Sequence, residues 1–451
     1  MNHFLTYRDT TLKVDNLKRV EISKSVSEES DKVVWWELML MFFLLAISGN
    51  PYIGIKQFEL FTVASVLITV AHILRNYKKS VSYRTIIIFV FLLGYEIMHA
   101  ILFKLDYTFT FFKLAIILLL STASVDILKH KFIDVLTKTM VLISLVSFVF
   151  VLISYTPLHS PLYRLADKLL PLNDYNGYHT PTVIIYTFCY EYFVGQLPYV
   201  RNAGIFWESG AFAVFLNITL FLHYSTKSIK SVKDLFNKES TILIIALAST
   251  TSTMGALSLM IILSFFSAQL KSALKYALLI IIIFSAYLAF TTVDFLGEKI
   301  NRELNQSKVT NNRFGSALKD FENIAERPLL GWSRRIEVVF NTTVYSAKTH
   351  RPNGFTNFLR NYGLVYFSFY FALVFYSFKN IYIYHNHSYN AYVPMFGVFL
   401  LCLISFSEVI FDLAFLKSLM FLSTAYIPLK DKLGKEPFKN PFQLNPTSRP
   451  L

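Results

Sequence analysis

Arg201 and Glu208 stand close together where a long polar segment meets an apolar run, in the stretch RNAGIFWESGAFA over residues 201–213. The planar fork of an arginine suits phosphate oxygens, and a carboxylate can orient that arginine or take a proton from a hydroxyl. Gly204 and Gly210 allow backbones to approach closely there. Ionisable groups at membrane depth are costly to maintain, so we interpret this pair as part of a functional site.

Further arginines occupy a second polar segment, residues 297–353. Those that could join Arg201 are Arg313, Arg327, Arg334, Arg335 and Arg351. A basic segment that faces anionic lipid headgroups would have the same composition, and this simpler interpretation suits Arg327 and Arg351. The other three are predicted to bind a diphosphate together with Arg201, because arginines stabilise such a leaving group when no metal ion does so.

Two side chains are candidates for a general base. His350 is the only histidine within residues 297–353, and its imidazole changes charge near neutral pH, although a single loop histidine can also be merely exposed. Glu208 is the alternative base, or else it orients Arg201 by a charge-assisted hydrogen bond. Glu96 and His99, one helical turn apart in an apolar run, could pair inside a helix bundle, and we interpret them as local polarity.

The common signatures of phosphate-loop, zinc-protease and serine-hydrolase chemistry do not occur in the sequence. No group of neighbouring carboxylates has the arrangement that holds Mg²⁺. Cys189 and Cys402 lie far apart and form neither a disulfide framework nor a metal pattern. We therefore expect no metal and no cofactor.

The composition is that of a membrane protein. Of the 451 residues, 54% are hydrophobic and 16% are charged, whereas soluble proteins carry roughly a quarter charged residues. The formal net charge is +14, but the lysines gather in short segments between apolar runs, as expected for cytoplasmic loops. We expect the membrane lipid, and not nucleic acid, to be the partner of this positive charge.

The apolar runs predict an all-α polytopic membrane protein with about twelve transmembrane helices. Residues 1–32 and 430–451 are expected to be cytoplasmic tails, and residues 33–429 the transmembrane domain, with large outer loops at 155–205 and 297–353. The individual spans are expected at residues 33–48, 53–74, 85–103, 108–125, 132–154, 205–224, 276–295, 354–378, 391–407 and 409–429.

Three further segments differ in pattern from these spans. Residues 182–197 are apolar and aromatic and are predicted to form a helix in the membrane interface. Residues 241–268 are either one tilted helix or two half-helices joined by the polar bend at 249–253, because both flanks are basic. Apolar residues recur at helical spacing between 314 and 325, which predicts an amphipathic surface helix that ends before Pro328.

Several segments together resemble the O-antigen polymerase and ligase superfamily. Residues 201–208 (RNAGIFWE) resemble its Arg-x-x-Gly-x-Phe-x-Glu/Asn segment, and residues 326–332 (ERPLLGW) its Glu-x-Pro-Leu-x-Gly box. Residues 353–364 (NGFTNFLRNYGL) are similar to the box that closes the second outer loop, and residues 251–256 (TSTMGA) to a serine-containing bend. Ligases, and many polymerases, usually begin the closing box with His-Asn. Pro352 and Asn353 occupy that position here and the histidine is displaced to His350, which favours a capsule or exopolysaccharide polymerase over a ligase.

The resemblance implies a membrane-embedded glycosyltransferase with a GT-C-like architecture, independent of metal, in the bacterial inner membrane. It would polymerise undecaprenyl-diphosphate-linked oligosaccharide repeats into O-antigen, capsule or exopolysaccharide, with its active site facing the periplasm or cell exterior. Donor and acceptor glycans, and a chain-length regulator protein, would be its partners. His350 or Glu208 would be the base, and Arg201 with Arg313 and Arg334 or Arg335 would stabilise the leaving diphosphate. An O-antigen ligase and a precursor flippase remain alternatives.

Overall fold

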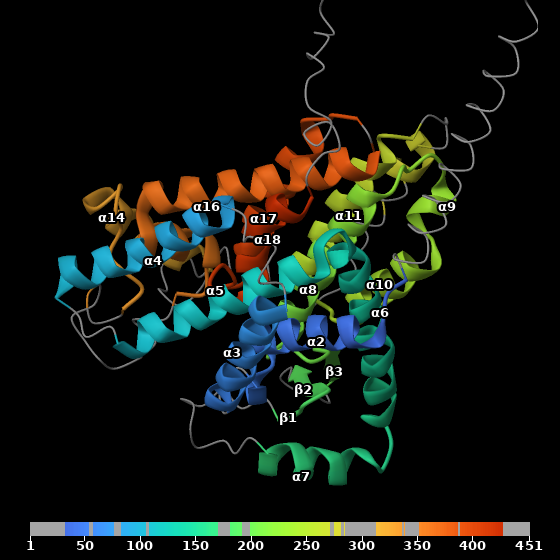
Figure 1. Cartoon of the computed structure of the whole chain (residues 1–451). Helices are drawn as coiled ribbons and strands as arrows, with labels where there is room; N and C mark the ends of the chain where they lie inside the picture. The colour runs from blue at the N-terminus through green and yellow to red at the C-terminus, as the bar shows by residue number, and fades with distance from the viewer. Residues whose placement is uncertain are drawn as a thin grey trace, which may run out of the picture.

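The computed structural model describes most of the chain between residues 32 and 426. The described ranges are 32–53, 57–75, 83–104, 108–169, 181–191, 199–270, 275–280, 284, 313–335, 338, 351–386 and 388–426. These residues are mostly helical, with one small sheet (Figure 1). The expected spans at 276–295 and both predicted tails lie wholly or mainly outside these ranges.

The described helices follow the apolar runs closely in the first half of the chain. They are α2 (Trp35–Gly49), α3 (Phe58–Arg75), α4 (Tyr83–Phe103), α5 (Thr108–Leu128), the 3₁₀ turn η2 (Lys129–Lys131), α6 (Phe132–Ile153) and the surface helix α7 (His159–Leu169). The second half contains α8 (Ser209–Thr226), α9 (Val232–Leu235), α10 (Lys238–Ser249), α11 (Thr253–Ser267), α14 (Arg313–Glu326), α16 (Gly354–Asn386), α17 (Tyr392–Ser405) and α18 (Ala414–Ala425).

Three runs among the described residues are long and apolar enough to cross a membrane: Tyr83–Phe103, Phe111–Ile153 and Gly354–Asn386. Shorter apolar helices occur at Trp35–Gly49, Glu59–Leu74, Thr253–Ser267, Tyr392–Ser405 and Ala414–Ala425. These helices indicate a helical membrane protein. The number of about twelve spans stays a prediction.

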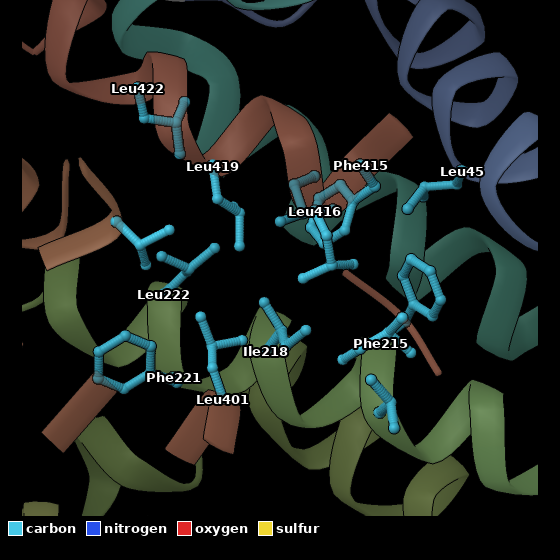
Figure 2. Close-up of a cluster of buried hydrophobic side chains, with 14 of the residues drawn as sticks. Leu45, Phe215, Ile218, Phe221, Leu222, Leu401, Phe415, Leu416, Leu419 and Leu422 are labelled. Carbon is cyan, nitrogen blue, oxygen red and sulfur yellow. The ribbon is translucent and has the colours of Figure 1, made fainter. Parts of the chain in front are cut away.

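The apolar core gathers around α18. This helix packs against α16, α5, α2 and α4, and its Phe415, Leu416, Leu419 and Leu422 are completely buried. Figure 2 shows these side chains directed toward α8 and α17 residues such as Ile218 and Leu401. A helix that is buried on every face is stable only when other helices surround it.

The prediction of an interface helix at residues 182–197 is wrong over its described part. This segment forms strands β1 (Thr182–Val183) and β2 (Tyr186–Glu191), and β2 pairs antiparallel with β3 (Tyr199–Asn202). Aromatic and β-branched residues favour this extended conformation. Tyr186 and Phe188 are buried together against Phe150 at the end of α6 and Ala166 of α7. The sheet thus occupies the space between α2 and α7 (Figure 1).

Residues 241–268 do not form one continuous helix. α10 ends at Ser249, Thr251 adopts a positive φ of 49°, and Ser252 begins α11 by accepting a hydrogen bond from the Gly255 amide, with a distance of 3.2 Å. The polar bend therefore separates two helices, as the two-half-helix interpretation predicts, and the interpretation as one tilted helix is wrong. The amphipathic helix expected near residues 314–325 is present as α14.

The segment that follows α14 packs against a break inside α16. Gly363 leaves the helical conformation with φ 67° and ψ 177°, and residues 328–333 run along the gap. The amides of Leu364 and Val365 donate to the carbonyls of Pro328 and Leu329, at 2.8 and 3.2 Å. In return, the amides of Trp332 and Ser333 donate to the carbonyls of Arg360 and Asn361, both at 2.9 Å. The two segments with family-like boxes, 326–332 and 353–364, are thus joined by backbone hydrogen bonds.

The Gly363→Ala variant is expected to be markedly less stable than the wild type. Its backbone region admits essentially only glycine, at a cost of about 1–3 kcal/mol for other residues, and a Cβ would clash with the Leu329 carbonyl oxygen. The matched control is Gly94→Ala in α4, where a Cβ meets nothing within 4 Å. Melting of both purified variants in detergent is the measurement. Equal melting temperatures would contradict the close approach.

Candidate functional site

Arg201 lies on β3 and reaches the bend between α10 and α11. Its Nε donates to the Thr251 hydroxyl at 3.0 Å and to the Thr250 carbonyl at 3.2 Å, and one terminal nitrogen donates to the Thr251 carbonyl at 3.3 Å. Carbonyls at the end of a helix lack intrahelical partners. Arg201 therefore closes the carboxyl end of α10 while only 9% of its surface remains exposed.

Cys189 places Arg201 and Glu208 near one another. It pairs with Arg201 across β2 and β3. Burial raises the pKa of the Cys189 thiol, the Arg201 guanidinium lowers it, and the Glu208 carboxylate raises it. Both charged groups thus act on the same partly buried thiol. Glu208 itself precedes the first turn of α8 as its N-cap residue and is half-buried.

A second carboxylate, Glu408, meets Glu208 at Gly210. A Cβ at position 210 would lie 2.7 Å from one oxygen of Glu408 and 3.6 Å from one oxygen of Glu208. Glycine at this position leaves room for both carboxylates beside the first turn of α8. Glu408 lies in the turn between α17 and α18 and is 6% exposed.

Arg313 joins this group from the start of α14. Its guanidinium lies 3.8 Å from a carboxylate oxygen of Glu408, and its Nε donates to the Ser407 carbonyl at 3.2 Å. We call Arg201, Glu208, Arg313 and Glu408 the arginine–carboxylate cluster. Three residues singled out in the sequence therefore gather in one region. Glu408 was missed, because a single acid at the edge of two apolar runs carries no spacing signal of its own.

The remaining residues singled out in the sequence lie elsewhere. Arg334 approaches Glu96 of α4, with 3.7 Å between guanidinium and carboxylate. Arg335 follows it and is half-buried. His350 lies outside the described residues, so its role as a base stays a prediction.

Glu96 and Arg334 belong to a larger group of buried charges. The Tyr362 hydroxyl lies within hydrogen-bond distance of two carboxyl groups, at 3.2 Å from Glu96 and 2.9 Å from Asp412. Lys417 of α18 lies 3.2 Å from Asp412 and donates to the Tyr366 hydroxyl at 3.0 Å. We call Glu96, Arg334, Tyr362, Tyr366, Asp412 and Lys417 the core charge network. The presence of a lysine inside the apolar run 409–429 was the signal that sequence reasoning overlooked.

The expected pair of Glu96 and His99 is replaced by separate partners. His99 contacts the Leu330 carbonyl at 2.8 Å through its Nε2, whereas Glu96 bonds to Tyr362. Within the described part of the chain, Glu96 Oε2 and His99 Nδ1 are buried without a hydrogen-bond partner. Glu96 is therefore more than a local polar residue of α4. Its contacts with Tyr362 and Arg334 link α4 to α16 and to the segment after α14.

A third ionic group fixes α14 against the start of α16. Asp320 is completely buried and accepts from Arg360 at 2.9 Å and from the Thr356 hydroxyl at 2.8 Å, with Arg351 at 3.4 Å. Burial raises the pKa of the Asp320 carboxyl, while Arg360 and Thr356 lower it. Arg351 therefore has a buried acidic partner, so the simpler interpretation as a lipid-facing cation does not describe it. The amino end of α16, beginning at Gly354, is held beside Glu408 as a result.

Arg327 also has defined contacts. Its guanidinium lies over the rings of Phe103 and Trp332, with 5.0 and 4.3 Å to the ring centroids. Such contacts are typical of cation–π attraction. No group of three or more His, Cys, Asp or Glu side chains that could hold a metal ion occurs within the described ranges.

Comparison of the chain with protein-family models, with characterised proteins and with solved structures finds no match in any of the three. The fold and these charges nevertheless define a class. The chain is a helical membrane protein that keeps several ionisable side chains inside its helix bundle and a polar cluster where α8, α14 and α16 begin.

Proposed function

We propose that this chain is a membrane-embedded glycosyltransferase. It polymerises undecaprenyl-diphosphate-linked oligosaccharide repeat units at the outer face of the bacterial inner membrane, with the lipid diphosphate as leaving group. The observation that carries the proposal is the arginine–carboxylate cluster. Arg313 meets Glu408 beside Glu208 where three helices begin, and Arg201 and Glu208 both act on Cys189.

The chemistry of this cluster suits both steps that a glycosyl transfer needs, which are deprotonation of the acceptor hydroxyl and departure of the diphosphate. Helix amino ends carry partial positive charge and, with arginine, favour a diphosphate. A carboxylate can take the proton of an acceptor hydroxyl. The hydroxyl oxygen then attacks the anomeric carbon of the donor from the face opposite the diphosphate, and the bond to the diphosphate breaks. A single displacement of this kind inverts the anomeric configuration.

The docking of residues 326–332 onto α16 supports the proposal independently. Both segments resemble boxes of the O-antigen polymerase superfamily, and here they are hydrogen-bonded to each other. The hydrogen bonds order the segment that carries Arg334 and the first turns of α16, which lie next to Glu408. A ligase would use the same parts.

A flippase is the second candidate function, because charges inside a helix bundle are typical of transporters. The two functions separate in cells. Deletion of a polymerase leaves single lipid-linked repeats on the outer face of the membrane, whereas deletion of a flippase leaves them on the inner face. Repeats that accumulate inside the deletion strain would refute the polymerase.

The direct test uses purified protein. It is incubated with lipid-linked repeat units isolated from the deletion strain, in the presence of a metal chelator, and the products are separated by size. A ladder of multiples of the repeat is expected. If the wild type produces no ladder under these conditions, but does so when a divalent cation is added, the metal-independent reaction is wrong.

A further inference from the structure

Glu408 is enclosed by the starts of three helices that come from distant parts of the sequence. One of its oxygens would lie 2.7 Å from a Cβ at Gly210 in the first turn of α8. Its own carbonyl would lie against a Cβ at Gly354, the first residue of α16. Arg313, the first residue of α14, approaches the same oxygen at 3.8 Å. Larger residues at either glycine would push Glu408 out of this position.

Hydrogen bonds also fix the backbone around Glu408. Its amide donates to the Ser405 carbonyl at 3.3 Å, and the Ser407 carbonyl accepts from Arg313 at 3.2 Å. A proton acceptor in catalysis needs a fixed position and a partner that orients it. Glu408 has both, whereas Glu208 is half-buried and caps α8 without a side-chain hydrogen bond to the helix.

Charged groups approach Glu408 from two helices. Arg313 approaches from α14 and Glu208 from the start of α8. Asp412, in the same turn as Glu408, is directed instead to Tyr362 and Lys417. Glu408 therefore has a cation and a second carboxylate beside it.

We propose that Glu408 is the catalytic base, a role that rests on the proposed glycosyl transfer. Its carboxylate accepts the proton of the acceptor hydroxyl while that oxygen forms the new bond to the anomeric carbon. The bond between the anomeric carbon and the diphosphate breaks, and the diphosphate leaves with the electron pair. The protonated Glu408 then releases its proton to water.

The test compares Glu408→Gln with the wild type in the ladder assay with lipid-linked repeat units from the deletion strain. The glutamine keeps the shape of the side chain, so folding is checked by melting in detergent. Transfer is expected to fall by about 10²–10⁴-fold, the usual contribution of a general base. Retention of the labelled donor on the purified protein is expected to be unchanged. Glu322→Gln, on the exposed face of α14, is the matched control.

The pH dependence separates a catalytic from a structural role. Wild-type activity is expected to fall in acid as Glu408 becomes protonated, and the residual activity of Glu408→Gln should lack this decline. A Glu408→Gln variant within twofold of an active wild type overturns the proposal. So does a result in which Glu208→Gln, and not Glu408→Gln, removes the acid decline. A wild type that produces no ladder instead refutes the glycosyl transfer itself.

Discussion

The Lys417→Ala variant is expected to lose about 3–5 kcal/mol of its free energy of unfolding, the usual cost of removing one partner from a buried ion pair. Lys417 is completely buried in α18. Its ammonium lies 3.2 Å from Asp412 and 3.0 Å from the Tyr366 hydroxyl. Without it, Arg334 would be the one remaining cation of the core charge network beside the carboxyl groups of Asp412 and Glu96.

The aromatic surroundings add to this effect. The Lys417 ammonium lies over the rings of Phe358, Tyr362, Tyr366 and Tyr370, with 5.2 to 5.8 Å to their centroids. Cation–π attraction is strongest where water is excluded. Alanine would remove this attraction and leave a cavity among the rings, which is a further cost.

Melting and urea titration of the purified protein in detergent would measure the loss. Lys233→Ala, at an exposed position in α9, is the control and is expected to melt like the wild type. The double variant Asp412→Asn with Lys417→Met tests the pair directly. It should be more stable than the sum of the two single effects predicts, because neither charge is then left alone. A Lys417→Ala variant as stable as the control would contradict the core charge network.

The Arg201→Lys variant is expected to reduce the proposed glycosyl transfer by about 10²–10³-fold, the typical loss when one donor to a developing oxyanion is removed. Lysine keeps the charge but cannot reproduce the planar fork. Arg201 uses that fork on the Thr250 and Thr251 carbonyls and the Thr251 hydroxyl. The bend between α10 and α11 would therefore also lose its fixed position relative to β3.

The ladder assay with lipid-linked repeat units measures this effect. Arg164→Lys, at an exposed position on α7, is the matched control and should keep full activity. Rates for Arg201→Lys that equal those of the control would remove Arg201 from the site. If strains with Arg201→Ala and with Arg313→Ala both still make full-length surface polymer, the whole assignment of diphosphate-binding residues is wrong.

The helical membrane class follows from the sequence alone. Apolar runs predicted α4, α5 and α6 to within a few residues, because hydropathy and helical spacing depend only on neighbours along the chain. The sequence also predicted α14 and its end before Pro328, because the amphipathic spacing and the proline both lie within that segment. Arg201 and Glu208 could be singled out because charges beside an apolar run are costly wherever the chain later places them.

Only the tertiary structure decided which charges meet. Glu408 lies about 200 positions from Glu208, and only the packing of the α17–α18 turn against α8 brings the two to Gly210. Arg334 was predicted to lie beside Arg201 but lies next to Glu96, because the backbone of residues 328–333 is hydrogen-bonded to α16 at the break around Gly363. The strands at residues 182–191 formed because partners at 199–202 were available. Local propensity cannot foresee such contacts, since the energy that selects them comes from elements distant in sequence.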